Sequence, residues 1–278
     1  MTPERDDLIV SSSAFRNEGL EAKEFSLEEG ALPENDPPPY VPPMTFRTCE
    51  LRATLDFWIG LCLAAAPLLP LSFAHADPAD GSLRLYAVDI WHDPPQSWGP
   101  GRGVYLGNGL ALTAAHVVGS AARTRPSVRI AGMDLPAKAI KEGSLERVDL
   151  TLLSIDEQKL PIYLRMRRMP LCEKSPWPGE PVIVAVPEET ARSHVISPLS
   201  LPFRVSRKFS TLIRDVGPTE NSGSGVFDTG NKCLLGIISR KFSVRPDSGD
   251  AESEQKDIAK YFVPASTIRA FLPTDYRF

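Results

Sequence analysis

The sequence has little of what binds metals or nucleic acids. It holds four cysteines and four histidines in 278 residues. No two of them stand at a spacing such as C-x-x-C or H-x-x-x-H, in which neighbouring side chains bind one zinc ion. We therefore expect no metal and no cofactor. No run of basic residues dominates, and Arg165-x-Arg167-Arg168 indicates a solvated strand end rather than a nucleic-acid patch, so no nucleic-acid partner is expected.

Long hydrophobic runs are also scarce, and the main one is Phe57–Ala66. Two arginines precede this run, and Ala74-His75-Ala76 follows it with the small residues that a signal peptidase accepts. A permanent transmembrane helix needs about 20 apolar residues, and two prolines interrupt the continuation of this run. We interpret residues 44–76 as a signal peptide cleaved after Ala76, and we expect no stable membrane anchor.

The first 43 residues are acidic and end in a proline-rich stretch, Asp36–Pro43. They carry three Lys and Arg against ten Asp and Glu. Such a composition cannot bury a core, so residues 1–43 are expected to be a disordered leader. Because signal peptides stand at the N-terminus, translation from Met44 would leave this leader untranslated. Translation from Met1 stays open as well, with the leader then forming a cytoplasmic tail on a signal anchor.

The chain after Ala76 has 202 residues and a net charge of about +3, which is the size of one compact domain. Short strands separated by turn residues predict an all-β barrel or sandwich. Gly107-Asn108-Gly109 suits a tight hairpin, and the amphipathic Ala265–Leu272 predicts a closing helix. The expected strands cover residues 84–88, 103–106, 110–113, 128–130, 137–140, 150–155, 181–186, 203–205, 210–213, 226–228, 234–239 and 261–264, with 203–205 and 210–213 as a candidate pair.

Three motifs carry the chemistry of a serine hydrolase. His116 lies in L-T-A-A-H-V, Asp149 lies between Val148 and Leu150, and Ser222 lies in N-S-G-S-G. A serine hydroxyl attacks a carbonyl only if an imidazole takes its proton, and a carboxylate must hold that imidazole in the right tautomer. Each residue also has a simpler interpretation, as a packed histidine, a turn-capping carboxylate and a Ser/Gly turn. The chain order His, Asp, Ser is the chymotrypsin order and differs from that of subtilisins and α/β-hydrolases.

With these motifs in this order, the chain resembles the bacterial trypsin-like serine peptidases of the chymotrypsin fold over residues 83–272. The resemblance implies two six-stranded antiparallel β-barrels with a short C-terminal helix. It places His116 and Asp149 in the first barrel and Ser222 in the second. It implies a periplasmic or secreted endopeptidase, a monomer without cofactor, which cleaves a polypeptide substrate through an acyl-enzyme on Ser222.

The resemblance also assigns the surroundings of the nucleophile. The backbone N–H groups of Glu220 and Ser222 would form the oxyanion hole. Ser239-Arg240-Lys241 would align the substrate backbone, and the segment that contains Gly217 and Thr219 would line the first side-chain pocket. The family usually has glycine where Glu220 stands. This difference keeps open a weak or inactive domain that binds a peptide or a protein, and an esterase would use the same residues.

Two cysteines, Cys172 and Cys233, remain after the expected cleavage. In an oxidising compartment such a pair favours a single disulfide. Two separate buried thiols are the alternative.

Overall fold

The computed structural model describes residues 7–11, 78–95, 99–214, 216, 222–245 and 256–274. All of them belong to one compact unit of the chain, which comprises Met1–Glu18 and Ala76–Phe278. The signal peptide interpretation of residues 44–76 therefore concerns residues outside the described part. Within the described ranges, no helix combines the length and the apolar character that crossing a membrane requires.

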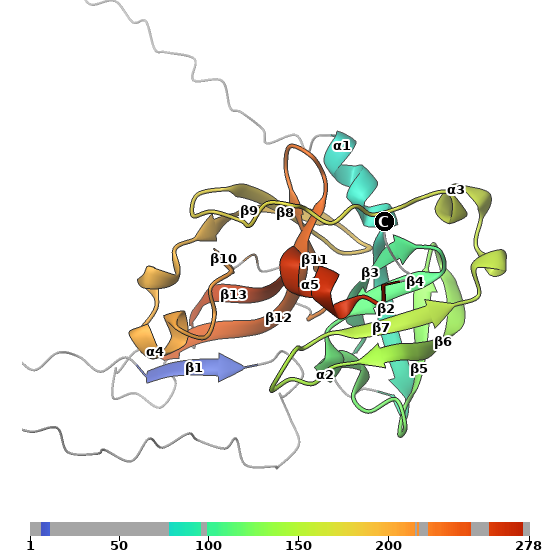
Figure 1. Cartoon of the computed structure of the whole chain (residues 1–278), viewed down its shortest axis with the longest axis horizontal. Coiled ribbons are helices and arrows are strands. Elements are labelled where there is room, and N and C mark those ends of the chain that lie inside the picture. The colour runs from blue at the N-terminus through green and yellow to red at the C-terminus, as the bar shows by residue number, and fades with distance from the viewer. Residues whose placement is uncertain are drawn as a thin grey trace, which may run out of the picture. The chain divides into compact units, whose positions relative to one another are not determined.

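The first half of the domain is a closed six-stranded barrel, drawn in cyan to green in Figure 1. Its neighbouring strands are antiparallel throughout. The β3–β4 hairpin turns at Asn108 and Gly109, with φ of +54° and +69°, as the Asn-Gly step predicts. In their order around the barrel the strands are β2 (Ala87–Asp93), β3 (Gly101–Gly107), β4 (Leu110–Thr113), β7 (Thr151–Ile155), β6 (Met133–Glu142) and β5 (Arg125–Ile130).

The second half closes in the same way, because β12 pairs with β11 and also with β13. The short helix α5 (Ala265–Phe271) follows β13 directly. The expected architecture of two six-stranded antiparallel barrels with a C-terminal helix is thus confirmed. Around this barrel the order is β12 (Leu234–Arg245), β11 (Gly225–Asp228), β8 (Pro181–Ala185), β9 (Thr190–Ile196), β10 (Leu212–Arg214) and β13 (Lys256–Pro264).

Short helical elements join the strands. The first of them, α1 and η1, lead into the first barrel, and α2 follows β4. The others lie between β7 and β10. Their bounds are α1 (Pro78–Gly81), η1 (Ser82–Leu85), α2 (Ala115–Val118), η2 (Glu157–Lys159), α3 (Ile162–Arg165), η3 (Pro198–Ser200) and α4 (Phe203–Ser206).

The two barrels share one buried apolar cluster. Val104 and Leu152 of the first barrel pack in it together with Phe227 and Ile237 of the second. Further clusters fill each barrel separately. Burial of this continuous apolar surface stabilises one arrangement of the two barrels, and this arrangement positions the residues at their junction.

The structure differs from the sequence-based expectations at four places. Arg84 and Leu85, expected to begin the first strand, lie in η1 instead. Phe203–Ser206 form the helical turn α4 rather than a strand, because Pro202 occupies its N-cap and so short a segment fits a strand or a helix equally well. The expected pair of 203–205 with 210–213 is therefore wrong, and β10 pairs with β9 and β13. Thr190–Ile196 form β9, which the sequence analysis missed because only Val195 is buried in it. Asp7–Ser11 form a strand, β1, inside the leader that was expected to be disordered, and β1 pairs with β12.

Candidate active site

His116 lies on α2, directly after the end of β4. Ala115, Val117 and Val118 on either side of it are buried in the barrel core, so this short helix cannot rotate without exposing them. The imidazole itself is buried, with 4% of its side chain exposed. The local sequence therefore fixes where the ring projects.

Asp149 binds His116 through both carboxylate oxygens. Oδ2 lies 2.7 Å from His116 Nδ1, and Oδ1 accepts a hydrogen bond of 3.0 Å from the His116 backbone N–H. Such a carboxylate holds the proton of a neutral imidazole on Nδ1 and leaves Nε2 as the basic nitrogen. Burial alone would raise the pKa of Asp149, but the hydrogen bonds and the charge of His116, with a hydrogen bond from Ser239, hold this pKa below its usual value.

Ser239 donates a hydrogen bond of 2.6 Å from Oγ to Asp149 Oδ2. The pairing of β12 with β13 skips one residue at this position, since Ile238 lies opposite Phe262 and Arg240 lies opposite Tyr261. Ser239 is therefore the extra residue of a β-bulge, a feature that turns a side chain away from the regular alternation. The sequence analysis assigned Ser239 to substrate alignment and missed this second role.

The backbone around Ser222 is held by strands of both barrels. Ser222 O accepts a hydrogen bond of 3.0 Å from the backbone N–H of Arg102 in β3. The next residue, Gly223, has φ of +94° and donates from its N–H to Ile238 O at 2.8 Å. A side chain at Gly223 would collide with Arg102 O and with Thr113 Oγ1, so only glycine allows this approach.

The structure joins two of the three expected catalytic residues directly. His116 and Asp149 are in contact. Nε2 is buried and lacks a hydrogen-bond partner in the part of the chain that the structure describes. A buried polar nitrogen of this kind normally has a partner. The arrangement thus presents an oriented base whose reactive nitrogen is unused.

Two of the expected substrate-aligning residues already have partners for their charges. The guanidinium of Arg240 donates to Leu145 O and lies over the ring of Phe209, with 5.5 Å to the ring centroid. Lys241 Nζ forms an ion pair of 2.8 Å with Asp257. Both side chains are therefore anchored to the protein. Gly217, Thr219 and Glu220, the other residues expected at the pocket and the oxyanion hole, lie outside the described residues.

Cys172 and Cys233 form a disulfide with a Cα–Cα distance of 5.1 Å. The two cysteines are 61 residues apart in the sequence, and Cys233 directly precedes β12. The described residues contain no cluster of three or more His, Cys, Asp and Glu that could hold a metal ion.

The sequence analysis missed two residues that brace the serine loop. Arg102 holds Ser222 O from β3, and Thr113 Oγ1 donates to Arg102 O at 2.5 Å. Thr113 belongs to the same motif as His116, so one short segment positions His116 and supports the loop that carries Ser222. No sequence signal marks Arg102, because its role depends on the packing of one barrel against the other.

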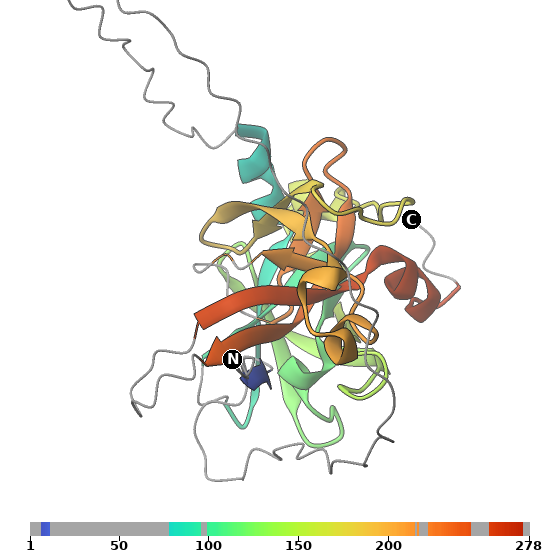
Figure 2. The ribbon, with the colours of Figure 1, turned by 90° about the vertical axis from the view of Figure 1, so that its left-hand side faces the viewer.

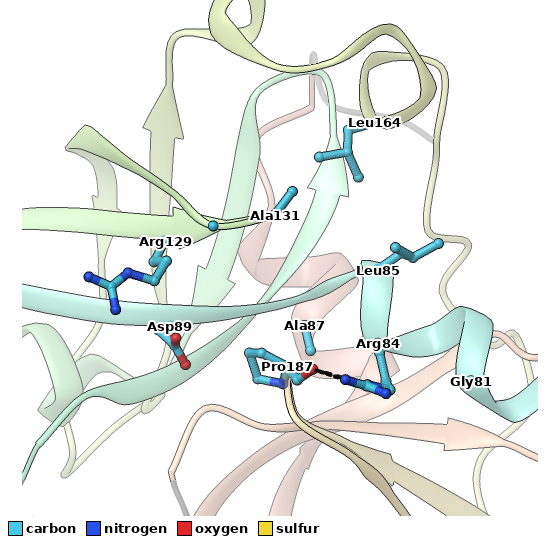
Figure 3. A pocket seen from close by; sticks show the side chains of 10 residues that line it. Gly81, Arg84, Leu85, Ala87, Asp89, Arg129, Ala131, Leu164 and Pro187 are labelled. Atoms are coloured by element: carbon cyan, nitrogen blue, oxygen red, sulfur yellow. Dashed lines mark hydrogen bonds between the residues drawn. The ribbon is translucent and has the colours of Figure 1, made fainter. Parts of the chain in front are cut away.

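A pocket of about 420 Å³ lies elsewhere on the domain (Figure 3). Arg84, Asp89 and Pro187 are among its lining residues, and the Arg84 guanidinium donates to Pro187 O. None of His116, Asp149, Ser222 or Ser239 lines it. This pocket is therefore not the candidate active site.

The chain has the fold of the trypsin-like serine peptidases. No protein-family model matches the sequence, and no curated protein sequence does either. Among solved structures, it is similar to the active form of the Rv3671c protease from M. tuberculosis, with 17% identity, a TM-score of 0.45 and coverage of 70% of this chain and 82% of that one.

Two further solved structures show a similar likeness. The serine endoprotease from Yersinia pestis has 17% identity and a TM-score of 0.47, with 70% of this chain and 65% of that chain covered. The MamO protease domain from Magnetospirillum magneticum has 17% identity and a TM-score of 0.45, with 69% and 97% covered. The activity of this protein must therefore be inferred from its own residues.

Proposed function

We propose that this protein is a serine endopeptidase with Ser222 as nucleophile, His116 as general base and acid, and Asp149 as the group that orients the imidazole. The observation that carries the proposal is the bidentate contact of Asp149 with His116, which leaves Nε2 buried and unused. The backbone of Ser222 is hydrogen-bonded to Arg102 in β3. The residue after Arg102, Gly103, pairs with Thr113, which lies three residues before His116.

The chemistry follows from these positions. Ser222 Oγ adds to the carbonyl carbon of the scissile peptide while its proton passes to His116 Nε2. The imidazolium then gives that proton to the departing amine, and the acyl group stays on Oγ. Water then adds to the acyl carbon while one of its protons passes to Nε2, and the bond from this carbon to Oγ breaks as the imidazolium returns the proton to Oγ and the acid leaves. Asp149 remains ionised throughout, because its depressed pKa favours the carboxylate next to the imidazolium.

We also propose that the enzyme acts as a monomer in the periplasm or outside the cell, after cleavage behind Ala76 has removed residues 44–76. The disulfide between Cys172 and Cys233 supports this location, because such bonds persist in oxidising compartments. The proposed substrate is a polypeptide. Its backbone would align on Ser239, Arg240 and Lys241, and the N–H groups of Glu220 and Ser222 would stabilise the oxyanion.

A second candidate function is peptide or protein binding by a domain with little or no hydrolytic activity. Two features favour it: Glu220 at the position where the family usually has glycine, and His116 Nε2, which has no hydrogen-bond partner among the described residues. The same residues would then hold a peptide without cleaving it.

Active-site labelling with a fluorophosphonate distinguishes the two functions. We expect the reagent to label the wild-type chain and the Ser224→Ala variant, but not Ser222→Ala. Ser224 is the matched control, because it lies two residues away and is buried as well. Labelling should also be lost in His116→Ala, since an unassisted serine hydroxyl reacts slowly. Absence of labelling in the wild-type chain, with a folded protein by circular dichroism, would favour the binding function.

A further inference from the structure

Two strands pair with successive parts of the edge of β12 that faces away from β13. β11 pairs with it up to Ile237, and β1 pairs with it over Lys241–Arg245. Both lie on the same edge, because β13 pairs with residues 236–244 of β12 and so occupies the opposite one. Between them lie Ile238, whose backbone bonds to Gly223 and Ser224, and then Ser239 and Arg240, with which no described strand pairs on this edge. Figures 1 and 2 both show β1, in blue, beside the far part of β12.

The direction of β1 points it at the candidate active site. It runs antiparallel to β12, with Asp7 opposite Arg245 and Ser11 opposite Lys241. The C-terminal end of β1 therefore lies nearest to Ser239, whose hydroxyl binds Asp149. A peptide that arrives along this edge in the same direction reaches the catalytic residues with its carboxyl end.

The register of β1 overlaps with the proposed substrate path. In the proposed alignment, the first three residues upstream of the scissile bond pair with Ser239, Arg240 and Lys241. Ser11 of β1 already pairs with Lys241. A substrate with three or more upstream residues and β1 would therefore compete for the same backbone groups, whereas a substrate with two upstream residues would not reach β1.

We propose that Asp7–Ser11 are a built-in competitor for long peptide substrates, so that the outer edge of β12 alternates between β1 and the upstream part of a substrate. This inference rests on the proposed function. An exposed strand edge is a template for an extended chain, and backbone hydrogen bonds supply most of the affinity in such an addition. The residues Leu8, Ile9 and Val10 favour an extended conformation.

Covalent attachment makes this competitor effective. A segment on the same chain binds at an effective concentration that reaches the millimolar range, so even a weak strand can keep an edge occupied. Cleavage after Ala76 would remove the segment together with the signal peptide. The competitor therefore acts in an uncleaved chain that begins at Met1 and keeps Asp7–Ser11 on the same side of the membrane as the barrels, an arrangement that differs from the cytoplasmic tail on a signal anchor. Processing would free the edge.

The test compares the full uncleaved chain with a variant in which β1 cannot pair. Ile9→Pro with Val10→Pro is suitable, because backbone N–H groups alternate in direction along a strand and one of these two points at β12. The control is Ile9→Val with Val10→Ile, which preserves β-propensity. Each chain is checked by intact mass, and chromogenic peptide libraries with two or with five residues upstream of the cleaved bond serve as substrates.

We expect the proline variant to show a KM about tenfold lower for the long substrates, which corresponds to β1 occupying the edge for about nine tenths of the time in the wild-type chain. The KM for the short substrates should not change. Hydrogen exchange should show that Lys241–Arg245 lose protection in the proline variant. A synthetic peptide of residues 5–13 should bind this variant at least about tenfold more tightly than the wild-type chain, by the same reasoning, and should restore the wild-type KM.

The proposal is overturned if hydrogen exchange finds no protection of Lys241–Arg245 in the wild-type chain, or if long and short substrates respond equally to the proline pair. It is also overturned if cells contain no chain that begins at Met1. Failure of the proposed function gives a different result: the fluorophosphonate labels no chain, while hydrogen exchange and binding of the residue 5–13 peptide still decide whether β1 occupies the edge.

Discussion

Ser239 Oγ and Asp149 Oδ2 form a hydrogen bond of 2.6 Å that joins the second barrel to the first. Asp149 directly precedes Leu150 and β7, whereas Ser239 lies at the bulge in β12. Asp149, which contacts the imidazole of His116, is thus held from both barrels. A shift of one barrel against the other would therefore change the orientation of this imidazole.

Replacement of Ser239 with alanine should lower kcat about tenfold or more, because a hydrogen bond to a charged group contributes about 1.5–3 kcal/mol and each 1.4 kcal/mol corresponds to a factor of ten. The lost bond also helps to lower the pKa of Asp149. This pKa should therefore rise, and activity should be lost at a higher pH on acidification, because a protonated Asp149 no longer orients the imidazole. Steady-state kinetics from pH 2 to 9 measure both effects.

The control for this experiment is Ser193→Ala. Ser193 Oγ donates to Arg214 O at 2.9 Å in the wall of the second barrel, away from Asp149. Its loss should leave kcat and its pH profile unchanged. A Ser239→Ala enzyme with the wild-type profile would show that the bond has no part in orienting Asp149.

Asp80 should be the acidic residue whose loss destabilises the domain most. It is buried on α1 and forms ion pairs of 2.5 Å with Lys232 and 2.7 Å with Arg192. Burial opposes its ionisation, but the hydrogen bonds from Lys232 and Arg192 outweigh it and lower the pKa of Asp80. Asp80→Asn removes the carboxylate from both ion pairs, whose cations are partly exposed, so we expect the free energy of unfolding to fall by about 1.5–3 kcal/mol at pH 7, as for the loss of a hydrogen bond to a charged group.

The pH dependence follows from the direction of this shift. A carboxyl group with a lowered pKa stabilises the folded state above its unfolded pKa of about 3.9, and this contribution disappears as the pH falls through the folded pKa. Urea unfolding of wild type and Asp80→Asn should therefore converge in strong acid. Asp134→Asn, which breaks the exposed pair with Arg129, is the control and should change the free energy of unfolding little.

Glu180 should behave in the opposite way. It is buried, and burial together with the nearby Asp228 raises its pKa, although the Trp177 backbone N–H donates to its carboxylate at 2.9 Å. A raised pKa stabilises the fold at low pH, and this contribution is lost as the pH rises through the folded pKa. Glu180→Gln retains an acceptor for Trp177 and carries no charge. We expect it to be more stable than wild type at pH 7 and equal to it below the unfolded pKa of about 4.3.

Thermal and urea unfolding from pH 3 to 8 test this expectation. Glu146→Gln, a substitution at an exposed position, is the control and should show no pH-dependent difference from wild type. A Glu180→Gln protein that is less stable than wild type at pH 7 would contradict the prediction.

The disulfide should contribute more to stability than any single surface ion pair. A bond that closes a 61-residue stretch is expected to stabilise the fold by about 4 kcal/mol through the entropy of the unfolded chain. Cys172→Ala with Cys233→Ala should lower the free energy of unfolding by about this amount without changing the barrels. Denaturant unfolding with and without reductant measures the effect, and reductant should leave the double variant unaffected.

Most of the barrel strands could be predicted because each carries local information. The hairpin between β3 and β4 needs positive φ at two positions, and the Asn108-Gly109 step supplies residues that adopt it. The strand β8 is a continuous apolar run, and four of its five residues are buried. The strand β9 and the helical turn α4 could not be predicted, because their side chains lie partly at the surface and show no period that the core imposes.

By itself, the sequence determined the chemistry that is available and the order in which it occurs along the chain: His116, Asp149 and Ser222, between strands whose apolar pattern requires an all-β core. Tertiary structure decided which atoms meet. The contact of Asp149 with His116, the bond from Ser239 and the support of Ser222 by Arg102 all join residues from separate strands, and neither periodicity nor spacing encodes the packing of one barrel against the other. The pairing of β1 with β12 was also decided by the tertiary structure. A strand edge binds its partner through backbone geometry, and the acidic composition around Asp7–Ser11 does not reveal this pairing.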